Sequence, residues 1–148
     1  MKEFLEDIIE EMKVIQKEGQ QLEFDYKGSH QFTSDKRMLK NIVINLVSNA
    51  LKFSPERSTI WISVKNESSR LELVVKDEGV GIPEEDQQHL FDTFFRAKNV
   101  INIQGTGLGL TIVKRYLDLL KGNIELISSY GKGTTVKVFL PELKPAEF

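Results

Sequence analysis

Three asparagines, Asn41, Asn45 and Asn49, follow one another at intervals of four residues, and Lys52 stands three residues after the last. Residues at this spacing lie nearly above one another on one face of an α-helix. A carboxamide oxygen is a neutral ligand that suits a Mg2+ ion already carrying phosphate, and a lysine ammonium suits the same phosphates. The spacing indicates a helix face able to hold magnesium-bound phosphates, although a solvated polar face would give the same pattern.

A second segment, Asp77-Glu-Gly79-Val-Gly81, directly follows an alternating apolar run. Glycines at the end of a strand allow a ligand to approach the backbone closely. The carboxylate can accept a hydrogen bond from the exocyclic amine of adenine, whereas guanine has a carbonyl at that position. Taken alone, the segment is equally compatible with a plain turn capped by the aspartate.

A third segment, Gly105-Thr106-Gly107-Leu108-Gly109-Leu110, precedes a helical pattern. Free backbone amides at a helix N-terminus bind anions, but a flexible hinge has the same composition. The segment lacks the Gly-Lys-Ser/Thr of a P-loop and the spacing of the dinucleotide fingerprint. Arg96 follows an aromatic cluster and could supply charge to a terminal phosphate, with a surface ion pair as the plain alternative.

Apolar periodicity predicts the elements that must position these segments. We expect four helices. The first covers residues 2–18, and the second runs from a cap at Ser34 or Asp35 to Ser54-Pro55. The third lies near 84–90, and the fourth covers 108–120 with Gly122 as its cap. Strands are expected at 22–26, 31–33, 60–64, 71–75, 124–127 and 134–140. This order predicts an α+β, two-layer α/β sandwich with a mixed, mostly antiparallel sheet of about five strands against about three helices.

The composition sets the broad class. The 148 residues suit one domain over residues 1–148 with a tail at 141–148, and 20 basic against 22 acidic residues give a net charge of -2. That balance recruits neither nucleic acid nor an anionic membrane, so we expect no direct contact with either. The chain has no cysteine, which excludes disulfides and thiolate metal sites. No apolar run approaches the roughly 18 to 20 residues of a membrane span.

Taken in order, the segments resemble the catalytic, ATP-binding domain of bacterial sensor histidine kinases, in the GHKL superfamily. The resemblance covers nearly the whole chain through an N box, a G1 box, an F box, a G2 box and a closing glycine motif. These are Asn45 to Phe53, Asp77 to Gly81, Phe91 to Arg96, Gly105 to Leu110, and Gly131-Lys-Gly-Thr134. It implies the Bergerat ATP-binding fold, with residues 97–104 as a mobile ATP lid.

The resemblance also implies a role for each matching residue. Asn49 is expected to bind Mg2+, Asn45 to lie on its phosphate side, and Lys52 to contact phosphate. Phe53 is expected to stack on adenine and Asp77 to specify it. The catalytic set is Asn45, Lys52 and Arg96. The other expected nucleotide-binding positions are Gly79, Gly81, Ile82, Gly105, Thr106, Gly107, Leu108, Gly109, Leu110 and Thr134.

Asn45 bears on the reaction type. ATP-hydrolysing relatives in the superfamily carry a glutamate one turn before the metal asparagine, where it activates water as a general base. The amide of Asn45 cannot take a proton, so we expect slow hydrolysis and transfer of the γ-phosphate to a histidine instead. Two alternatives stay open: a non-catalytic, ATP-binding regulatory module, and a serine kinase of the anti-sigma-factor type.

The expected phosphate acceptor is not in this sequence. The family places its histidine in a His-Glu/Asp motif, whereas His30 and His89 stand in Ser-His-Gln and Gln-His-Leu. We therefore expect an excised, monomeric domain that acts on the histidine-bearing dimerisation domain of the same kinase, a homodimer in the full protein. A response regulator would act downstream. The expected location is the cytoplasmic portion of a sensor kinase, with or without a membrane anchor.

Overall fold

A computed structural model describes residues 1–81 and 109–143 of the chain. One five-stranded sheet has the order β1-β2-β3-β5-β4. Its strands are β1 (Gln21–Gly28), β2 (Thr59–Glu67), β3 (Arg70–Asp77), β4 (Asn123–Ser129) and β5 (Gly133–Pro141). Strands β1 and β2 are parallel, and the other neighbouring pairs are antiparallel. The predicted mixed, mostly antiparallel sheet is confirmed.

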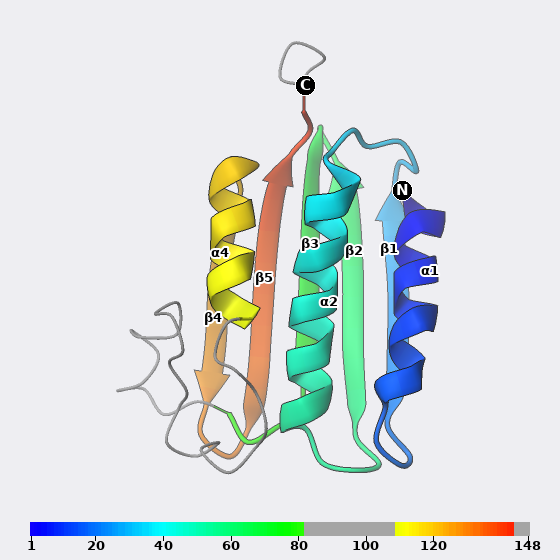
Figure 1. Ribbon diagram of the computed structural model, residues 1–148, viewed down its shortest axis with the longest axis vertical. Helices are drawn as coiled ribbons and strands as arrows, with labels where there is room; N and C mark the ends of the chain where they lie inside the picture. The colour runs from blue at the N-terminus through cyan, green and yellow to red at the C-terminus, as the bar shows by residue number, and fades with distance from the viewer. Residues whose placement is uncertain (82–108, 144–148) are drawn as a thin grey trace.

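The helices of the described residues form a second layer on one face of the sheet (Figure 1). They are α1 (Lys2–Met12), a short 3-10 helix η1 (Lys13–Ile15), α2 (Lys36–Phe53) and α4 (Gly109–Leu119). The predicted α+β two-layer sandwich is therefore the observed architecture. None of the described helices is long and apolar enough to cross a membrane.

The core lies between these two layers, because alternate strand residues point toward the helices. In the central strands, Ile62 of β2 pairs with Val75 of β3, which pairs with Val136 of β5. Ile62 and Val75 are almost fully buried. Trp61 lies on the opposite face of the sheet and stays 39% exposed. The predicted alternation of β2 and β3 is confirmed.

Helix α2 is specified by an N-cap residue at its start and by an apolar stripe along its buried face. The backbone N–H of Met38 donates to Asp35 Oδ1 at 3.0 Å, so Asp35 rather than Ser34 is the N-cap. Apolar residues recur every three or four positions and pack into the core. The buried members are Leu39, Ile42, Val43, Leu46, Val47, Ala50 and Leu51. The helix ends before Ser54, as predicted from Pro55.

Two predicted elements differ from the structure near the N-terminus. The predicted helix over 2–18 ends at Met12 and continues only as η1, because Val14 and Ile15 are 86% and 51% exposed and have no core to cover. The strand predicted at 31–33 is absent from the sheet. Its backbone bonds elsewhere. Gln31 O accepts from Asn66 Nδ2 at 2.9 Å, Thr33 N–H donates to the Glu142 carboxylate at 2.8 Å, and Thr33 O accepts from Leu143 N–H at 2.9 Å.

The end of α4 also differs in detail from the prediction. The left-handed residue is Lys121, with φ of 60°, rather than Gly122. Lys121 N–H donates to Asp118 O at 3.3 Å and Gly122 N–H donates to Leu117 O at 2.7 Å, the two bonds of a Schellman cap. A Cβ on Gly122 would lie 2.6 Å from Phe139 O, so this glycine serves close packing on β5.

Several sequence segments meet at one end of the sheet, the lower end in Figure 1. The C-terminal turn of α2, the end of β3 and the start of β5 lie there, and the N-terminal end of α4 points the same way. The predicted helix near 84–90, the F box and the predicted lid at 97–104 lie outside the described residues. The fold thus gathers the N box, the G1 box and the closing glycine motif.

Candidate nucleotide-binding site

Asp77 lies at the centre of the group formed by the N box, the G1 box and the closing glycine motif, which we call the Asp77 cluster. It is the last residue of β3 and pairs in register with Thr134 of β5. Its Oδ1 accepts from the backbone N–H of Gly79 at 2.8 Å and from that of Thr134 at 3.2 Å. Neither bond uses Oδ2, and within the described ranges no other donor or cation pairs with it. Two backbone donors therefore fix the carboxylate, and among the described residues its second oxygen stays available to a ligand.

Burial raises the pKa of Asp77 above its usual value. The physical cause is the loss of water around the charged form, and the hydrogen bonds from Gly79 and Thr134 lower the pKa by less than burial raises it. A half-buried carboxylate with a raised pKa at the end of a strand is a candidate for function, because its charge costs free energy that packing alone does not require.

Gly79 brings the loop of residues 77–81, the Asp77 loop, against the end of α2. A Cβ at this position would lie 2.5 Å from Phe53 O and 2.9 Å from Asp77 Oδ1. The next residue, Val80, donates its N–H to the same Phe53 carbonyl at 3.2 Å. Since no side chain fits between the two backbones, glycine is required for this contact.

Gly81 does the same on the other side of the loop. It has φ of +72°, and a Cβ would lie 2.0 Å from Ser129 O. Gly131 N–H donates to Val80 O at 2.6 Å, which joins the loop to the β4–β5 turn. In the structure, the positions that a Cβ would take at Gly79 and Gly81 are filled by protein backbone. That these glycines also let a ligand approach the backbone stays a prediction.

The predicted asparagine ladder is present on α2. Asn41 Nδ2 donates to Arg37 O at 3.1 Å, and Asn45 Nδ2 donates to Asn41 O at 2.7 Å. Each amide thus bonds back to the carbonyl four residues earlier. The Asn49 side chain has no such bond to any residue that the structure describes, so its whole amide is available. In the described part of the chain, no group of three or more His, Cys, Asp or Glu residues could hold a metal ion.

The remaining predicted residues divide into two groups. Lys52 is exposed and Phe53 half-buried, both in the last turn of α2, while Gly109 and Leu110 open α4. Thr134 bonds through its hydroxyl to Ser128 Oγ at 2.8 Å, a neighbour that no sequence motif indicated. Six predicted positions lie outside the described residues: Ile82, Arg96, Gly105, Thr106, Gly107 and Leu108.

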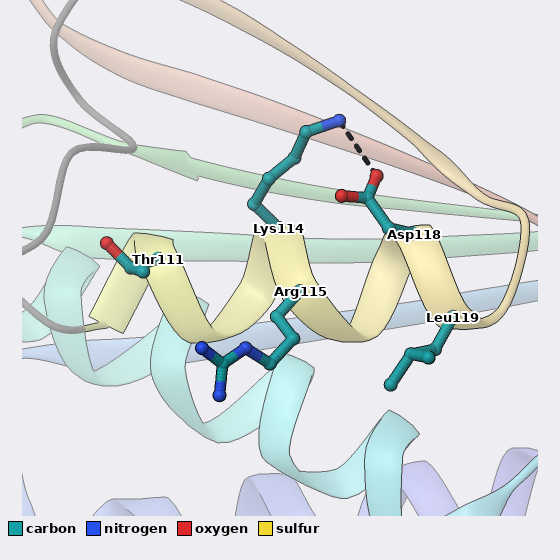
Figure 2. A pocket seen from close by; sticks show the side chains of 5 residues that line it. All are labelled: Thr111, Lys114, Arg115, Asp118 and Leu119. Atoms are coloured by element: carbon teal, nitrogen blue, oxygen red, sulfur yellow. Dashed lines mark ion pairs between the residues drawn. The ribbon is translucent and has the colours of Figure 1, made fainter.

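A separate depression lies on the outer surface of α4 (Figure 2). Its lining residues are Thr111, Lys114, Arg115, Asp118 and Leu119. Lys114 Nζ pairs with Asp118 Oδ1 at 3.0 Å, and Arg115 and Leu119 extend from the other side of the helix. None of these residues is among the predicted nucleotide positions, so this depression is distinct from the Asp77 cluster.

Comparison with known proteins decides the family. A sequence model described as "Histidine kinase-, DNA gyrase B-, and HSP90-like ATPase" matches residues 34–144, most of the chain. The chain belongs to this ATPase family. The resemblance inferred from the N, G1, F and G2 boxes is confirmed, and the protein is an ATP-binding domain of the histidine kinase-like ATPase fold.

Curated relatives of this ATPase domain are sensor histidine kinases. The circadian input-output histidine kinase CikA of Synechococcus elongatus is 40% identical over 121 residues, which cover 78% of this chain and 16% of that protein. The sensor protein kinase PmrB of Pseudomonas aeruginosa is 43% identical over 108 residues, which cover 72% of this chain and 23% of that protein. The chain therefore spans less than a quarter of the length of either relative.

Solved structures confirm the fold of the ATPase domain. The mycobacterial sensor histidine kinase MprB superposes with a TM-score of 0.84 and 26% identity, covering 96% of this chain and 95% of that one. The catalytic domain of histidine kinase ThkA gives a TM-score of 0.79 and 25% identity, covering 100% of this chain and 95% of that one. The whole of this chain thus corresponds to nearly the whole of a histidine kinase catalytic domain.

Proposed function

We propose that this domain binds ATP together with Mg2+ and transfers the γ-phosphate to a histidine of a separate dimerisation domain in two-component signalling. The observation that carries the proposal is the junction of the α2 C-terminal turn with the Asp77 loop, through Val80 N–H and Phe53 O at 3.2 Å. This junction brings an adenine-type acceptor close to the end of a helix that carries amide and ammonium groups. The kinase names of the relatives support the same reaction.

Adenine would be selected by Asp77 in this proposal. Oδ1 is occupied by two backbone donors, so Oδ2 is the acceptor for the exocyclic amine. The carboxylate has no proton to give, and the carbonyl of guanine would meet it as a second acceptor. Phe53, half-buried beside the Asp77 loop, provides an aromatic face for the base.

The phosphates and the metal ion would be held by α2. The donor set fits Mg2+, because the amide of Asn49, which is not bonded within the described residues, offers an oxygen and the ion keeps phosphate and water as its other ligands. When bound, Mg2+ would neutralise charge on the transferring phosphoryl group. Lys52 would add a second positive charge, with Arg96 as a third. Asn45 donates from its Nδ2 to Asn41 O, and its amide cannot act as the general base that would activate water.

The partners follow from the same reaction. The domain would meet the phosphoacceptor histidine on the dimerisation domain of its own kinase, and a response regulator would then receive the phosphate. Because ATP is the donor, we place the domain in the cytoplasm.

A transfer assay tests the proposed function directly. The domain is mixed with a fragment carrying the dimerisation hairpin of a related sensor kinase and with ATP labelled at the γ-phosphate. We expect acid-labile, base-stable label on the hairpin fragment, which is the behaviour of phosphohistidine. A hairpin with its histidine replaced by alanine is the control and should stay unlabelled. Acid-stable label would instead indicate a serine kinase, and no label with intact ATP binding would indicate a regulatory module.

Asn49→Ala is expected to weaken Mg-ATP binding about tenfold or more, since a bond to a charged group contributes about 1.5 to 3 kcal/mol. Titration calorimetry with Mg2+ and with EDTA measures the part of the affinity that needs the metal. We expect Asn49→Ala to lower only this metal-dependent part, while the affinity for ATP in EDTA stays unchanged.

Asn41→Ala is the matched control for Asn49→Ala. Asn41 is on the same ladder, but it lies two turns before Asn49 and its amide is engaged with Arg37 O. We expect Mg-ATP affinity within about twofold of wild type for this variant. Equal losses of Mg-ATP affinity in the two variants would show that the asparagines stabilise the helix rather than bind the metal ion.

A further inference from the structure

The carbonyls of residues 51–55, at the end of α2, all accept hydrogen bonds from groups outside the helix. Lys17, in the connection between η1 and β1, supplies two of these bonds. Its Nζ lies 2.7 Å from Lys52 O and 2.8 Å from Ser54 O. Two further bonds come from Val80 N–H to Phe53 O at 3.2 Å and from Ser58 Oγ to Pro55 O at 2.6 Å.

Gln20 supplies the rest from a buried position. Only 3% of this residue is exposed. Its Nε2 lies 3.0 Å from Leu51 O, 3.1 Å from Ser54 O and 3.2 Å from Pro55 O. Its Oε1 accepts from Lys17 N–H at 2.8 Å, so the side chain is held at both ends.

The end of α2 needs such donors. The last carbonyls of a helix lack intrahelical partners, and a left-handed glycine commonly supplies the backbone bonds that satisfy them. Here the C-cap is Ser54 in an extended conformation, with φ of -100° and ψ of 147°, so that backbone cap is missing. Lys17 and Gln20 replace it, and the lysine charge also complements the negative end of the helix dipole.

The turn that these side chains hold is the turn that carries Lys52 and Phe53. We propose that Lys17 and Gln20 are positioning residues for the nucleotide: they fix the α2 C-terminal turn so that Lys52 faces the phosphates and Phe53 the base. This inference rests on the proposed function, because it assigns no new ligand. The two residues belong to the segment that leads from the N-terminal helix into the sheet. The nucleotide site thereby depends on a segment that none of the nucleotide motifs includes.

Lys17 and Gln20 together form a clamp on the end of α2, and its loss should appear as weaker binding rather than only as lower stability. A freed helix end samples conformations in which Lys52 and Phe53 are misplaced, and the apparent dissociation constant rises by the reciprocal of the competent fraction. If about a tenth of the molecules keep the competent turn, Mg-ATP affinity falls about tenfold.

The test compares Gln20→Met with a matched control, Asn66→Leu. Asn66 is also a buried amide, 4% exposed, whose Nδ2 makes three bonds, to Ser29 O at 2.6 Å, Gln31 O at 2.9 Å and Tyr26 Oη at 3.3 Å. It lies near the far end of β2 from the site. Both variants should unfold at lower temperature. At a temperature where both are folded, calorimetry should show about tenfold weaker Mg-ATP binding for Gln20→Met only.

Lys17 provides a second variant that does not disturb the core, because the residue is exposed. Lys17→Met should weaken Mg-ATP binding severalfold, and Lys17→Arg should restore most of it, since a guanidinium can also donate to two carbonyls. The loss of Mg-ATP affinity caused by Lys17→Met should be smaller in a Lys52→Ala background, because the Lys52 ammonium that Lys17 helps to position is then absent.

The outcomes separate this inference from the proposed function. If wild type does not bind Mg-ATP, the proposed function fails and the inference fails with it. If wild type binds and Lys52→Ala weakens binding, but both clamp variants bind like wild type, the clamp is structural only and the inference alone is overturned. Equal losses of affinity for Gln20→Met and Asn66→Leu would overturn it as well.

Discussion

Asp77→Asn is expected to lower ATP affinity about a hundredfold while leaving the domain folded, the equivalent of about 3 kcal/mol for a hydrogen bond to a charged group. The asparagine oxygen can still accept from Gly79 and Thr134, whose N–H groups now bind Oδ1 of the aspartate. The amide nitrogen would then occupy the place of Oδ2 and meet the exocyclic amine of adenine as a second donor. Titration calorimetry with ATP measures the loss of affinity. Asp25→Asn, at an exposed position of β1, is the control.

The same substitution has an opposite consequence for stability. Because the folded-state pKa of Asp77 is raised, its contribution to stability is present below the unfolded-state pKa and is lost as pH rises through the folded-state pKa. Asparagine carries no charge, so the variant does not suffer this loss. Relative to wild type, we expect Asp77→Asn to gain free energy of unfolding as pH rises across that window and to stay constant above it.

Urea denaturation over a pH series checks this sign. A relative stability of Asp77→Asn that fell with rising pH would contradict the raised pKa. ATP affinity of the wild type should decline as pH falls through the same folded-state pKa, because the protonated carboxyl loses its acceptor role. The affinity of the variant should stay flat in that window, apart from titration of the nucleotide itself.

Gly133→Ala is expected to destabilise the domain by about 3 kcal/mol, at the upper end of the range for backbone strain. Gly133 has φ of +95°, and a Cβ would lie 2.3 Å from Asp77 O. The clash pushes β5 away from the end of β3, so the Thr134 N–H would lose its 3.2 Å bond to Asp77 Oδ1. ATP affinity should therefore fall together with stability.

Gly131→Ala separates strain from clash. Gly131 has a similar φ of +82°, but nothing lies within 4 Å of an added Cβ. Its cost should be only about 1 kcal/mol from the left-handed backbone. Urea denaturation measures the free energy of unfolding of both variants. Equal destabilisation would show that the contact between the added Cβ and Asp77 O does not contribute to the cost of Gly133→Ala.

The elements predicted well are those whose signals are local. The stripe of α2 and the cap at Asp35 use spacings of three and four residues, which one helix satisfies without other parts of the chain. The alternation in β2 and β3 is equally local, since it needs only one covered face. The helix over 2–18 was predicted too long, because Val14 and Ile15 continue the apolar pattern beyond the core that could bury them.

The sequence by itself determined the family, the two-layer architecture and the residue types available for ATP, because five motifs keep a fixed order along the chain. Only the tertiary structure decided how they meet. Gly79 and Gly81 pack backbone against backbone, and Asp77 directs one oxygen inward to Thr134, more than fifty residues away. The Lys17 and Gln20 clamp likewise joins groups over thirty residues apart, and such contacts leave no periodic pattern in a sequence.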